Sequence, residues 1–483
     1  MKNNKVAVNL FYQTIFQVVK IIIPIITIPI VSRALGPKGI GINSFTNSVA
    51  QYFILFAALG ISIYGNREIA ISKNNRKKML QTFNDIFIMK LITTIFSLII
   101  YFVLIFIFYK ENMLFFILQS INIIAVFIDI SWFFMGLEDF KKTSLANLFV
   151  QLITFGLIVY FIKKPADIGY YILIQAVGNV VAQIIPWFFL IHEYKRVFMF
   201  PILSNIKKHF LGTVKYFIPQ IAIIMYSTLN KTILGTISTE ENVGYYTNTV
   251  SLVSAIVTIV TTIDLVMLPR MSNLFSTNNI RQIDTYISKS INAEMYIATP
   301  IAFGLAAISS KFVPWFFGES FSQLSILLPI MSPLIIIIPL GVSISRQYLL
   351  PQDKTKEYTI SVFIGALVSI VTSLAMIPIL GLYGAIVANL LAEIVVTLYR
   401  VKWFLKNTVF RFNKLYYAKI IFSSLVMSIS IYFIFHNSAP SILITCIQVV
   451  FGVIIYLFLS YILKIDFIIK FFGKFLNKRT EKK

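Results

Sequence analysis

Long apolar runs, interrupted by short polar stretches, recur along the whole chain. A run of about 18 or more residues, rising about 1.5 Å per residue, can cross the ~30 Å hydrocarbon core of a bilayer as a helix. We predict fourteen such helices, at residues 10–32, 41–63, 84–108, 113–136, 144–162, 170–191, 211–236, 244–266, 289–309, 322–343, 358–378, 382–399, 418–436 and 440–463. The segments between them are short, so the pattern predicts an all-α polytopic membrane protein without a sizeable domain outside the bilayer.

Composition leads to the same class of protein. Hydrophobic residues make up 58% of the 483 residues and charged residues only 13%, which is outside the usual range of a soluble domain. The single cysteine, Cys446, excludes an internal disulfide, and the three histidines are scattered, so we expect neither a metal site nor a catalytic site. No small-residue cleavage site follows the first apolar segment, and we expect that segment to remain a helix.

The net charge of +23 reflects membrane orientation. With a cytoplasmic N-terminus, 32 of the 42 lysines and arginines fall in inside segments, 6 in outside segments and 4 within spans. Cytoplasmic loops carry such an excess, so both termini are predicted to be cytoplasmic. The basic surface would also attract anionic membrane lipid, and no nucleic-acid partner is needed to explain it.

Two short motifs occur twice at equivalent places. The first and seventh spans contain "KIIIP" (20–24) and "KYFIP" (215–219), and the second and eighth begin with "GINSFTNSV" (41–49) and "GYYTNTV" (244–250). We therefore predict two six-helix lobes in parallel orientation, 1–210 and 211–410, followed by two extra helices and a basic interfacial tail in 411–483. Parallel repeats are typical of transporters, although the match is short enough for chance to be the alternative.

Polar side chains follow one face of two predicted helices. Gln13, Gln17 and Lys20 are spaced four and three apart in the first span, where a lysine near the bilayer centre costs on the order of 3 kcal/mol. The eighth span carries a similar series of hydroxyls, at Thr247, Ser251, Ser254 and Thr258. Such faces favour a polar cavity. For the hydroxyls, hydrogen bonding to their own helix or close helix packing is the alternative.

Four acidic residues lie within or beside predicted spans. Asp129 and Glu393 lie deep within the membrane-spanning segments, where they could either pair with lysines or carry a coupling ion. A proton or sodium gradient would then drive transport. Asp264 and Glu294 lie near the cytoplasmic span ends, and we expect solvent to reach them.

Several segments together resemble a known family, the polysaccharide repeat-unit (Wzx-type) flippases of the multidrug/oligosaccharidyl-lipid/polysaccharide (MOP) exporter superfamily. The resemblance covers nearly the whole chain and rests on "SRALGPKGIG" (32–41), "YGNREIA" (64–70), "WFFMGLEDFKKTSLAN" (132–147), "IPQIAIIMYSTLNKTILG" (218–235), "LPRMS" (268–272) and "GLYGAIVANLLAE" (381–393). One departure is Asn230, where relatives often have an acid before the lysine. Ion coupling at that position is therefore in doubt.

The resemblance implies a transporter that moves an undecaprenyl-pyrophosphate-linked oligosaccharide from the inner to the outer leaflet of the bacterial cytoplasmic membrane, for a capsule, exopolysaccharide or similar polymer. Polysaccharide polymerases and assembly proteins are the implied partners. The pyrophosphate would be neutralised in a basic cavity between rocking lobes by Lys20, Lys215, Lys231, Lys90 and Arg33. The sugars would bind the polar faces, at Gln13, Gln17, Asn47, Thr247, Ser251, Ser254 and Thr258. For the lysines other than Lys20, extension to the membrane surface is the alternative.

Three other functions are compatible with a polytopic protein. A multidrug antiporter of the same superfamily would favour acids, and not bases, in its cavity. A lipid-linked-sugar polymerase or ligase would need a larger outside loop than this sequence offers. A membrane scaffold would not need lysines within spans at matching places in two halves.

Overall fold

The computed structural model describes residues 2–195, 199–277 and 280–465, with side chains in the first helix from Ile22 onward. Within these ranges every regular element is a helix. The N-terminal helices are α1 (Lys2–Ala58), α2 (Ile61–Ser72), α3 (Arg76–Phe108), α4 (Met113–Ile128), α5 (Ser131–Gly136), α6 (Phe140–Phe161), η1 (Pro165–Asp167), α7 (Ile168–Tyr194) and α8 (Leu203–Ile237). They are followed by α9 (Glu240–Val260), α10 (Thr262–Ser276), α11 (Ile280–Phe316), η2 (Glu319–Phe321), α12 (Leu324–Met331), α13 (Leu334–Ile344), η3 (Ser345–Leu349), α14 (Thr355–Leu380), α15 (Leu382–Asn407), α16 (Lys414–Ile434) and α17 (Ile442–Ile462).

The predicted all-α polytopic fold is confirmed. Among the described residues, 13 helical segments are long and apolar enough to cross a membrane. The first of them, Ile22–Ser72, has 51 residues, far more than one crossing requires. It covers residues 22–32 of the first predicted span and the whole of the second, 41–63, so one helical segment takes the place of two predicted spans and accounts for the difference from the expected fourteen.

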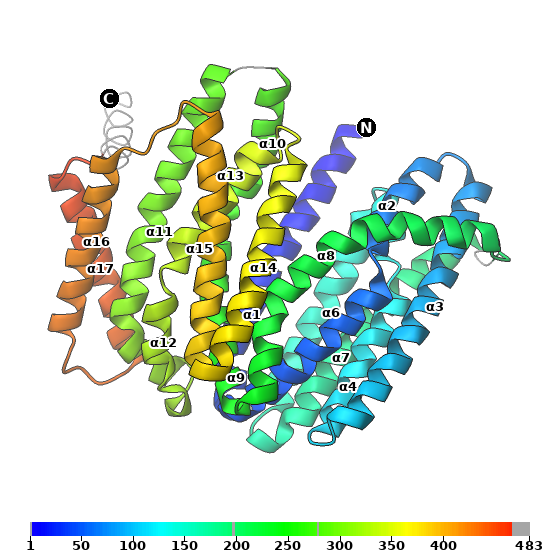
Figure 1. Cartoon of the computed structure of the whole chain (residues 1–483), viewed down its shortest axis with the longest axis horizontal. Coiled ribbons are helices and arrows are strands. Elements are labelled where there is room, and N and C mark those ends of the chain that lie inside the picture. Colours follow the sequence, from blue (N-terminus) through cyan, green and yellow to red (C-terminus); the bar gives the residue numbers. More distant parts are fainter. Residues whose placement is uncertain (1, 196–198, 278–279, 466–483) are drawn as a thin grey trace. The chain divides into compact units, whose positions relative to one another are not determined.

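A break in α1 separates those two spans. Gly36 has φ 66° and ψ 178°, outside the helical region, and Pro37 follows it. A residue with a Cβ atom rarely adopts this φ, and proline has no N–H to continue the helical hydrogen bonds. The two halves of α1 therefore run in different directions, as Figure 1 shows.

The chain forms two compact units. Unit 1 is Met1–Gly244 and contains α1 to α8 with the first turn of α9, and unit 2 is Tyr245–Lys483. In unit 1, α8 packs against α1, α2 and α3, although the sequence-based division makes α8 the start of the second lobe. The lobe boundaries at 210 and 410 stay a prediction. The predicted interfacial tail lies in 466–483, outside the described residues.

Two glycines allow a close backbone crossing within unit 1. A Cβ atom on Gly41 would lie 1.7 Å from the carbonyl oxygen of Glu240, and one on Gly244 would lie 2.0 Å from that of Pro37. These glycines open the two matching motifs of the sequence. The two matching motifs therefore begin where α1 and α9 contact each other, and the contact requires glycine on both helices.

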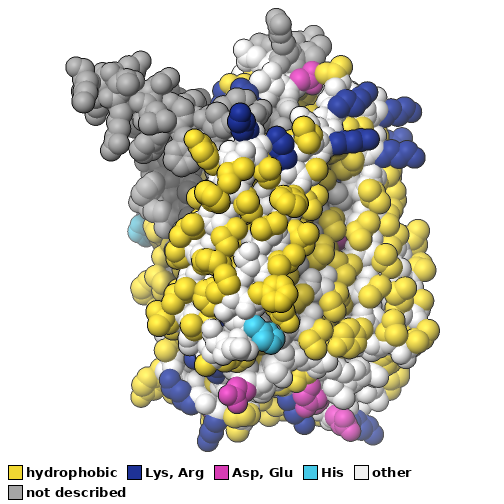
Figure 2. Space-filling model, turned by 90° about the vertical axis from the view of Figure 1, so that its left-hand side faces the viewer, with side chains coloured by type: hydrophobic (Ala, Val, Ile, Leu, Met, Phe, Trp, Pro, Cys, Tyr) yellow, Lys and Arg dark blue, Asp and Glu magenta, His cyan; other side chains and the backbone are white. Residues whose placement is uncertain are grey.

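The outward surfaces are strongly apolar. On α3 the exposed side chains include Phe96, Ile99, Val103 and Ile107. On the face drawn in Figure 2, a broad hydrophobic band lies between charged side chains at its upper and lower edges. Such a band is what a surface in contact with lipid requires, and this is a multi-pass membrane protein.

We predict that Gly41→Ala prevents α1 and α9 from meeting as they do. The added methyl group would overlap a backbone oxygen, and backbone cannot move aside as a flexible side chain can. We expect a loss of several degrees in the thermal unfolding midpoint of the purified protein, or a failure to accumulate in membranes.

Gly156→Ala is the matched control. Gly156 lies in α6, and a Cβ atom there would meet nothing within 4 Å. Because alanine is favoured over glycine in a helix by about 1 kcal/mol, this variant should be as stable as the wild type or slightly more so. Equal behaviour of the two variants would contradict the crossing.

Candidate functional site

A polar cavity of about 280 Å³ lies inside unit 1, among α1, α4 and α7. Eight of its eleven lining side chains are polar: Asn47, Gln51, Gln119, Asn122, Asp129, Gln175, Asn179 and Gln183. Each helix contributes residues three or four positions apart, which share one helix face. Since carboxamides are poorly accommodated in hydrocarbon, these faces turn toward one another and away from lipid.

Hydrogen bonds connect the carboxamides across the three helices. Asn179 Nδ2 donates to Asn122 Oδ1 at 2.8 Å, and Asn122 Nδ2 donates to Gln119 Oε1 at 2.9 Å. Gln119 Nε2 then donates to Asn43 Oδ1 at 3.2 Å. Each amide has two N–H groups and an oxygen with two lone pairs, so the chain leaves donors and acceptors available on the cavity side.

Asp129, the residue after α4, lines one end of the cavity and forms an ion pair with the buried Lys90. Lys90, on α3, is only 1% exposed, and its ammonium donates to the backbone carbonyl of Asp129 at 2.6 Å. The carboxylate lies 3.8 Å from the same nitrogen and accepts from the N–H of Ser131 at 2.8 Å. One charge of each sign is present, and the cavity is close to neutral overall.

The arrangement can bind a neutral polyhydroxylated group. Carboxamides offer both donors and acceptors, and each hydrogen bond contributes about 1 kcal/mol net. At about 30 Å³ per molecule, the cavity has room for roughly nine waters, or for part of a sugar. Contacts of this kind are numerous and individually weak.

The five basic residues assigned to the pyrophosphate have different surroundings. The side chain of Lys20 lies outside the described residues. Lys90 is buried on Asp129, which excludes its extension to the membrane surface. Arg33 and Lys215 are exposed, and Lys231 is half-buried on α8. Among the described residues, no two of these charged groups contact one another, and their role in substrate binding stays a prediction.

The residues assigned to sugars are divided in the same way. The side chains of Gln13 and Gln17 lie outside the described residues, whereas Asn47 lines the polar cavity. On α9 in unit 2, Ser254 and Thr258 are exposed, and Thr258 donates to the carbonyl of Ser254 at 2.7 Å. Ser251 is half-buried. The hydroxyl of Thr247 is buried without a hydrogen-bond partner in the described structure.

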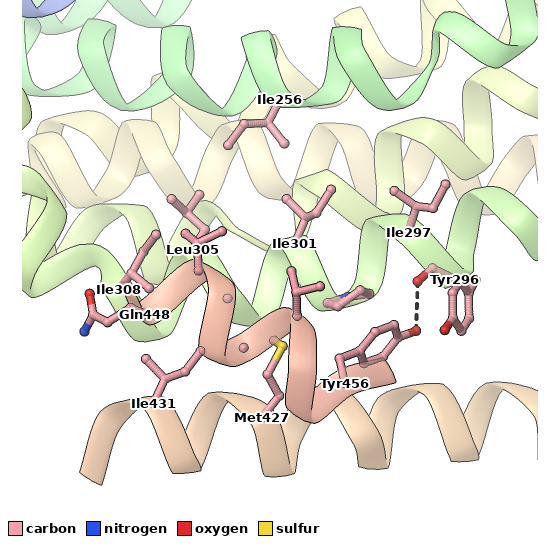
Figure 3. Close-up of a pocket in the computed structure, with 15 residues that line it drawn as sticks. Ile256, Tyr296, Ile297, Ile301, Leu305, Ile308, Met427, Ile431, Gln448 and Tyr456 are labelled. Atoms are coloured by element: carbon pink, nitrogen blue, oxygen red, sulfur yellow. Dashed lines mark hydrogen bonds between the residues drawn. The ribbon is translucent and has the colours of Figure 1, made fainter. Parts of the chain in front are cut away.

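Unit 2 contains an apolar groove of about 380 Å³ between α11, α16 and α17 (Figure 3). Isoleucines of α11, together with Met427 and Ile431 of α16, line it. At one end the hydroxyl of Tyr456 donates to the carbonyl of Tyr296 at 2.8 Å. The two C-terminal helices therefore create a surface suited to a hydrocarbon chain.

The acidic residues agree with expectation only in part. Asp129 pairs with a lysine, one of its two predicted possibilities, and Glu393 is half-buried on α15. Their role in ion coupling stays a prediction. The expected solvation of Asp264 and Glu294 is wrong, because both residues are 0% exposed. The helix α13 packs on α11 and the segment η3 packs on α10, and together they cover these two residues.

Most of the cavity was not found from the sequence. Gln51, Gln119, Asn122 and the series on α7 were missed, although Gln175, Asn179 and Gln183 repeat every four residues. That spacing is a detectable signal. Carboxamides carry no charge, so a prediction based on charged residues within spans does not include this series.

Solved structures show the class of fold. The chain is similar to a structure of the lipid II flippase MurJ in an inward closed conformation, with a TM-score of 0.76, 15% identity and coverage of 94% of this chain and 100% of the other. It is also similar to an inward-facing multidrug resistance MATE family transporter of the MOP superfamily, with a TM-score of 0.61, 15% identity and coverage of 80% and 96%. The chain therefore has the same class of fold as these two structures.

Within that class, the chain belongs to the family described as polysaccharide biosynthesis protein, whose model matches residues 6–275. Two relatives carry the name "Putative O-antigen transporter". The one from Escherichia coli (strain K12) is 25% identical over 82% of this chain and 96% of its own length, and the one from Shigella dysenteriae is 23% identical over 59% and 72%. The resemblance inferred from the sequence motifs is confirmed.

The Lys90–Asp129 pair is open to a double-mutant test. Asp129→Asn would leave a buried ammonium without its counter-charge, and breaking a buried pair typically costs about 3 kcal/mol. Because the Asp129 side chain is 22% exposed, we expect about 2 kcal/mol here. Thermal or denaturant unfolding of the purified protein measures this loss.

The double variant Lys90→Met with Asp129→Asn provides the comparison. It removes both charges at once, so it should recover much of the stability lost in Asp129→Asn alone. Equal losses in the single and double variants would show that the two charges do not stabilise one another.

Proposed function

We propose that this chain moves oligosaccharides linked to a polyprenyl pyrophosphate across the bacterial cytoplasmic membrane, from the inner to the outer leaflet. The carboxamide-lined cavity of unit 1 is the observation that carries the proposal. A cavity of this chemistry inside membrane-spanning helices suits hydroxyl-rich cargo that would otherwise have to cross hydrocarbon without hydrogen bonds. Undecaprenyl is the lipid that the family resemblance implies.

The sugars would exchange hydrogen bonds with water for hydrogen bonds with Asn122, Asn179 and the other carboxamides. Because each replacement changes the free energy by only about 1 kcal/mol, the cargo is held without being trapped. Carboxamides both donate and accept, so they tolerate hydroxyls in many orientations. This chemistry suits a transporter that must bind and then release a bulky, varied head group.

The lipid tail has a different requirement. A polyprenyl chain is hydrocarbon throughout, and the groove between α11, α16 and α17 offers an apolar wall of matching character. The tail would remain in contact with this groove and with membrane lipid while the head group crosses. One unit then serves the polar part of the cargo and the other the apolar part.

The pyrophosphate needs positive charge while it is away from water, because an unpaired dianion in hydrocarbon is prohibitively costly. Lys20, Lys215, Lys231 and Arg33 are our candidates to supply it. Lys90 is already paired with Asp129 and is the weakest of the five. A basic cavity between lobes with alternating access is part of this proposal.

The names of the relatives support the polymer class. Two relatives are named as O-antigen transporters, and a protein of similar fold is named as a lipid II flippase. Capsule and exopolysaccharide are alternative destinations for the same type of cargo. The proposal further includes cytoplasmic termini, polymerases and assembly proteins as partners, and a proton or sodium gradient as the energy source.

Removing the cavity carboxamides should impair export. In Asn122→Leu/Asn179→Leu, two hydrogen-bonding side chains are replaced by apolar ones of similar size, each costing about 1 kcal/mol, or roughly fivefold in rate. The measurement is surface polymer, and lipid-linked oligosaccharide retained on the inner leaflet, in cells whose only flippase is this protein.

Asn407→Leu is the control, since Asn407 is exposed at the end of α15 and far from the cavity in sequence. It should export normally. Normal export by Asn122→Leu/Asn179→Leu at wild-type protein levels would mean that the cavity does not bind the cargo, and the proposed function would lose its main support. Extrusion of cationic drugs in place of glycolipid would favour a multidrug antiporter.

Lys20→Ala should abolish export while the protein remains inserted in the membrane. The substitution removes one ammonium from the first span, and we expect the pyrophosphate to lose its counter-charge. Lys20→Arg, which keeps the charge, should retain part of the activity. Normal surface polymer with Lys20→Ala would end the assignment of this residue to the head group.

A further inference from the structure

Unit 2 contains two carboxyl groups buried side by side. Asp264 lies on α10 and Glu294 on α11, and both residues are 0% exposed. The helix α13 and the segment η3 pack against these two helices and close the site. Isolated ionised carboxylates are very costly in such surroundings, so the way in which these two are stabilised has to be accounted for.

One hydroxyl serves both carboxyl groups. Ser343 Oγ lies 2.8 Å from Asp264 Oδ1 and also contacts Glu294 Oε2. A serine hydroxyl has a single hydrogen and can donate to only one of them. The second contact is attractive only if the other carboxyl group carries a proton and donates it. Hydrogen-bond counting therefore requires one bound proton at this site.

The remaining contacts indicate which carboxyl group holds that proton. Gln347 Nε2 donates to Asp264 Oδ1 at 2.6 Å, and it also lies 2.8 Å from Ser290 Oγ and 3.1 Å from Ser343 Oγ. Asp264 Oδ1 is thus surrounded by donors, as an ionised carboxylate requires. Among the described residues, Glu294 has the shared serine as its one donor, and its carboxyl group also hydrogen-bonds directly to that of Asp264, which a carboxyl group can do only when one of the two carries a proton. The proton belongs on Glu294.

Three oxygens of the same cluster have no partner. Asp264 Oδ2, Glu294 Oε1 and Gln347 Oε1 are buried and make no hydrogen bond among the described residues. Native proteins leave few such groups, and those that remain call for an explanation. Unused acceptors within this cluster can accept a proton, or a hydrogen bond from the water that would carry it.

The surrounding charges are unequal. Arg346 is half-buried on η3, and of the cations in the described part of the chain it is the one whose charge interacts with both carboxyl groups. On α15, Arg400 donates instead to the carbonyl of Gly341 and to Ser361, while Lys289 on α11 is exposed. The helix α13 carries no titratable side chain. Two negative charges at this site would face a single nearby positive charge.

We propose that Asp264 and Glu294 form an exchangeable proton site, with the proton on Glu294 and Asp264 as its ionised neighbour. Release breaks the Glu294 O–H bond, leaves the electron pair on the carboxylate and passes the proton to water. The pair then changes from one negative charge to two. Because the closed packing of α10, α11 and η3 cannot accommodate that charge, release requires this region to open.

Proton occupancy is thereby linked to a change in conformation of unit 2. The η3 segment supports the link, since Ser345–Leu349 form a π-helical turn that contains Gln347 and interrupts the regular helical hydrogen bonds. Such turns are frequent at functional sites. The use of this proton to drive transport rests on the proposed function; the site itself does not.

Infrared spectroscopy of the full-length protein in lipid nanodiscs tests the site directly, because a protonated carboxylic acid has a C=O stretch distinct from that of a carboxylate. At neutral pH we expect a band from a buried acid, sensitive to deuterium exchange. Glu294→Gln should remove it, and Asp264→Asn should keep it at a changed frequency. Glu319→Gln, at an exposed position, should leave it unchanged.

Absence of the band at neutral pH, or its persistence in Glu294→Gln, would overturn the proposal. If Glu294→Gln fails to fold, the frequency change in Asp264→Asn still decides whether the acid lies beside Asp264. Export by cells forms the second arm: Glu294→Gln should lose at least tenfold, and normal export would overturn the coupling role. If the wild type exports no glycolipid at all, the proposed function fails while the infrared result stands.

Discussion

Hydrocarbon offers no hydrogen-bond partner, and this constraint governs every polar group that the chain carries within its spans. Three such cases are each satisfied by contacts within one unit. Lys90 lies on Asp129, the carboxamides of α4 and α7 bond to each other, and Asp264 and Glu294 share Ser343. Where some donors or acceptors remain without a partner after these contacts are made, they are available to bind a ligand or a proton.

The two units differ in the chemistry of the groups that remain available for binding. Unit 1 leaves amide donors and acceptors facing a cavity, whereas unit 2 leaves an apolar groove and a pair of carboxyl groups. A lipid-linked sugar is itself divided into a hydroxyl-rich head and a hydrocarbon tail. The proposed cargo therefore matches the two surfaces separately, and neither surface alone would suit the whole molecule.

The site could be predicted from the sequence only in part. Asn47 was assigned to sugar binding on the basis of the family resemblance, and it lines the cavity. Lys90 was predicted as a free charge for the substrate, but Asp129, 39 residues later, pairs with it. The spacing of residues along one helix does not reveal such a partner. The same limitation made Asp264 and Glu294 look solvated, because the helix that covers them comes some fifty residues later than Glu294 in the chain.

The sequence by itself determined the membrane-spanning class, the helical spans and the break at Gly36 and Pro37. Each of these depends on local properties: the length of an apolar run against the thickness of hydrocarbon, and the backbone conformations open to glycine and proline. Only the tertiary structure decided which polar faces meet, which charges are paired and which acids are buried. Those outcomes depend on side chains contributed by helices far apart in the chain, and the environment of a buried group is set by its neighbours in space.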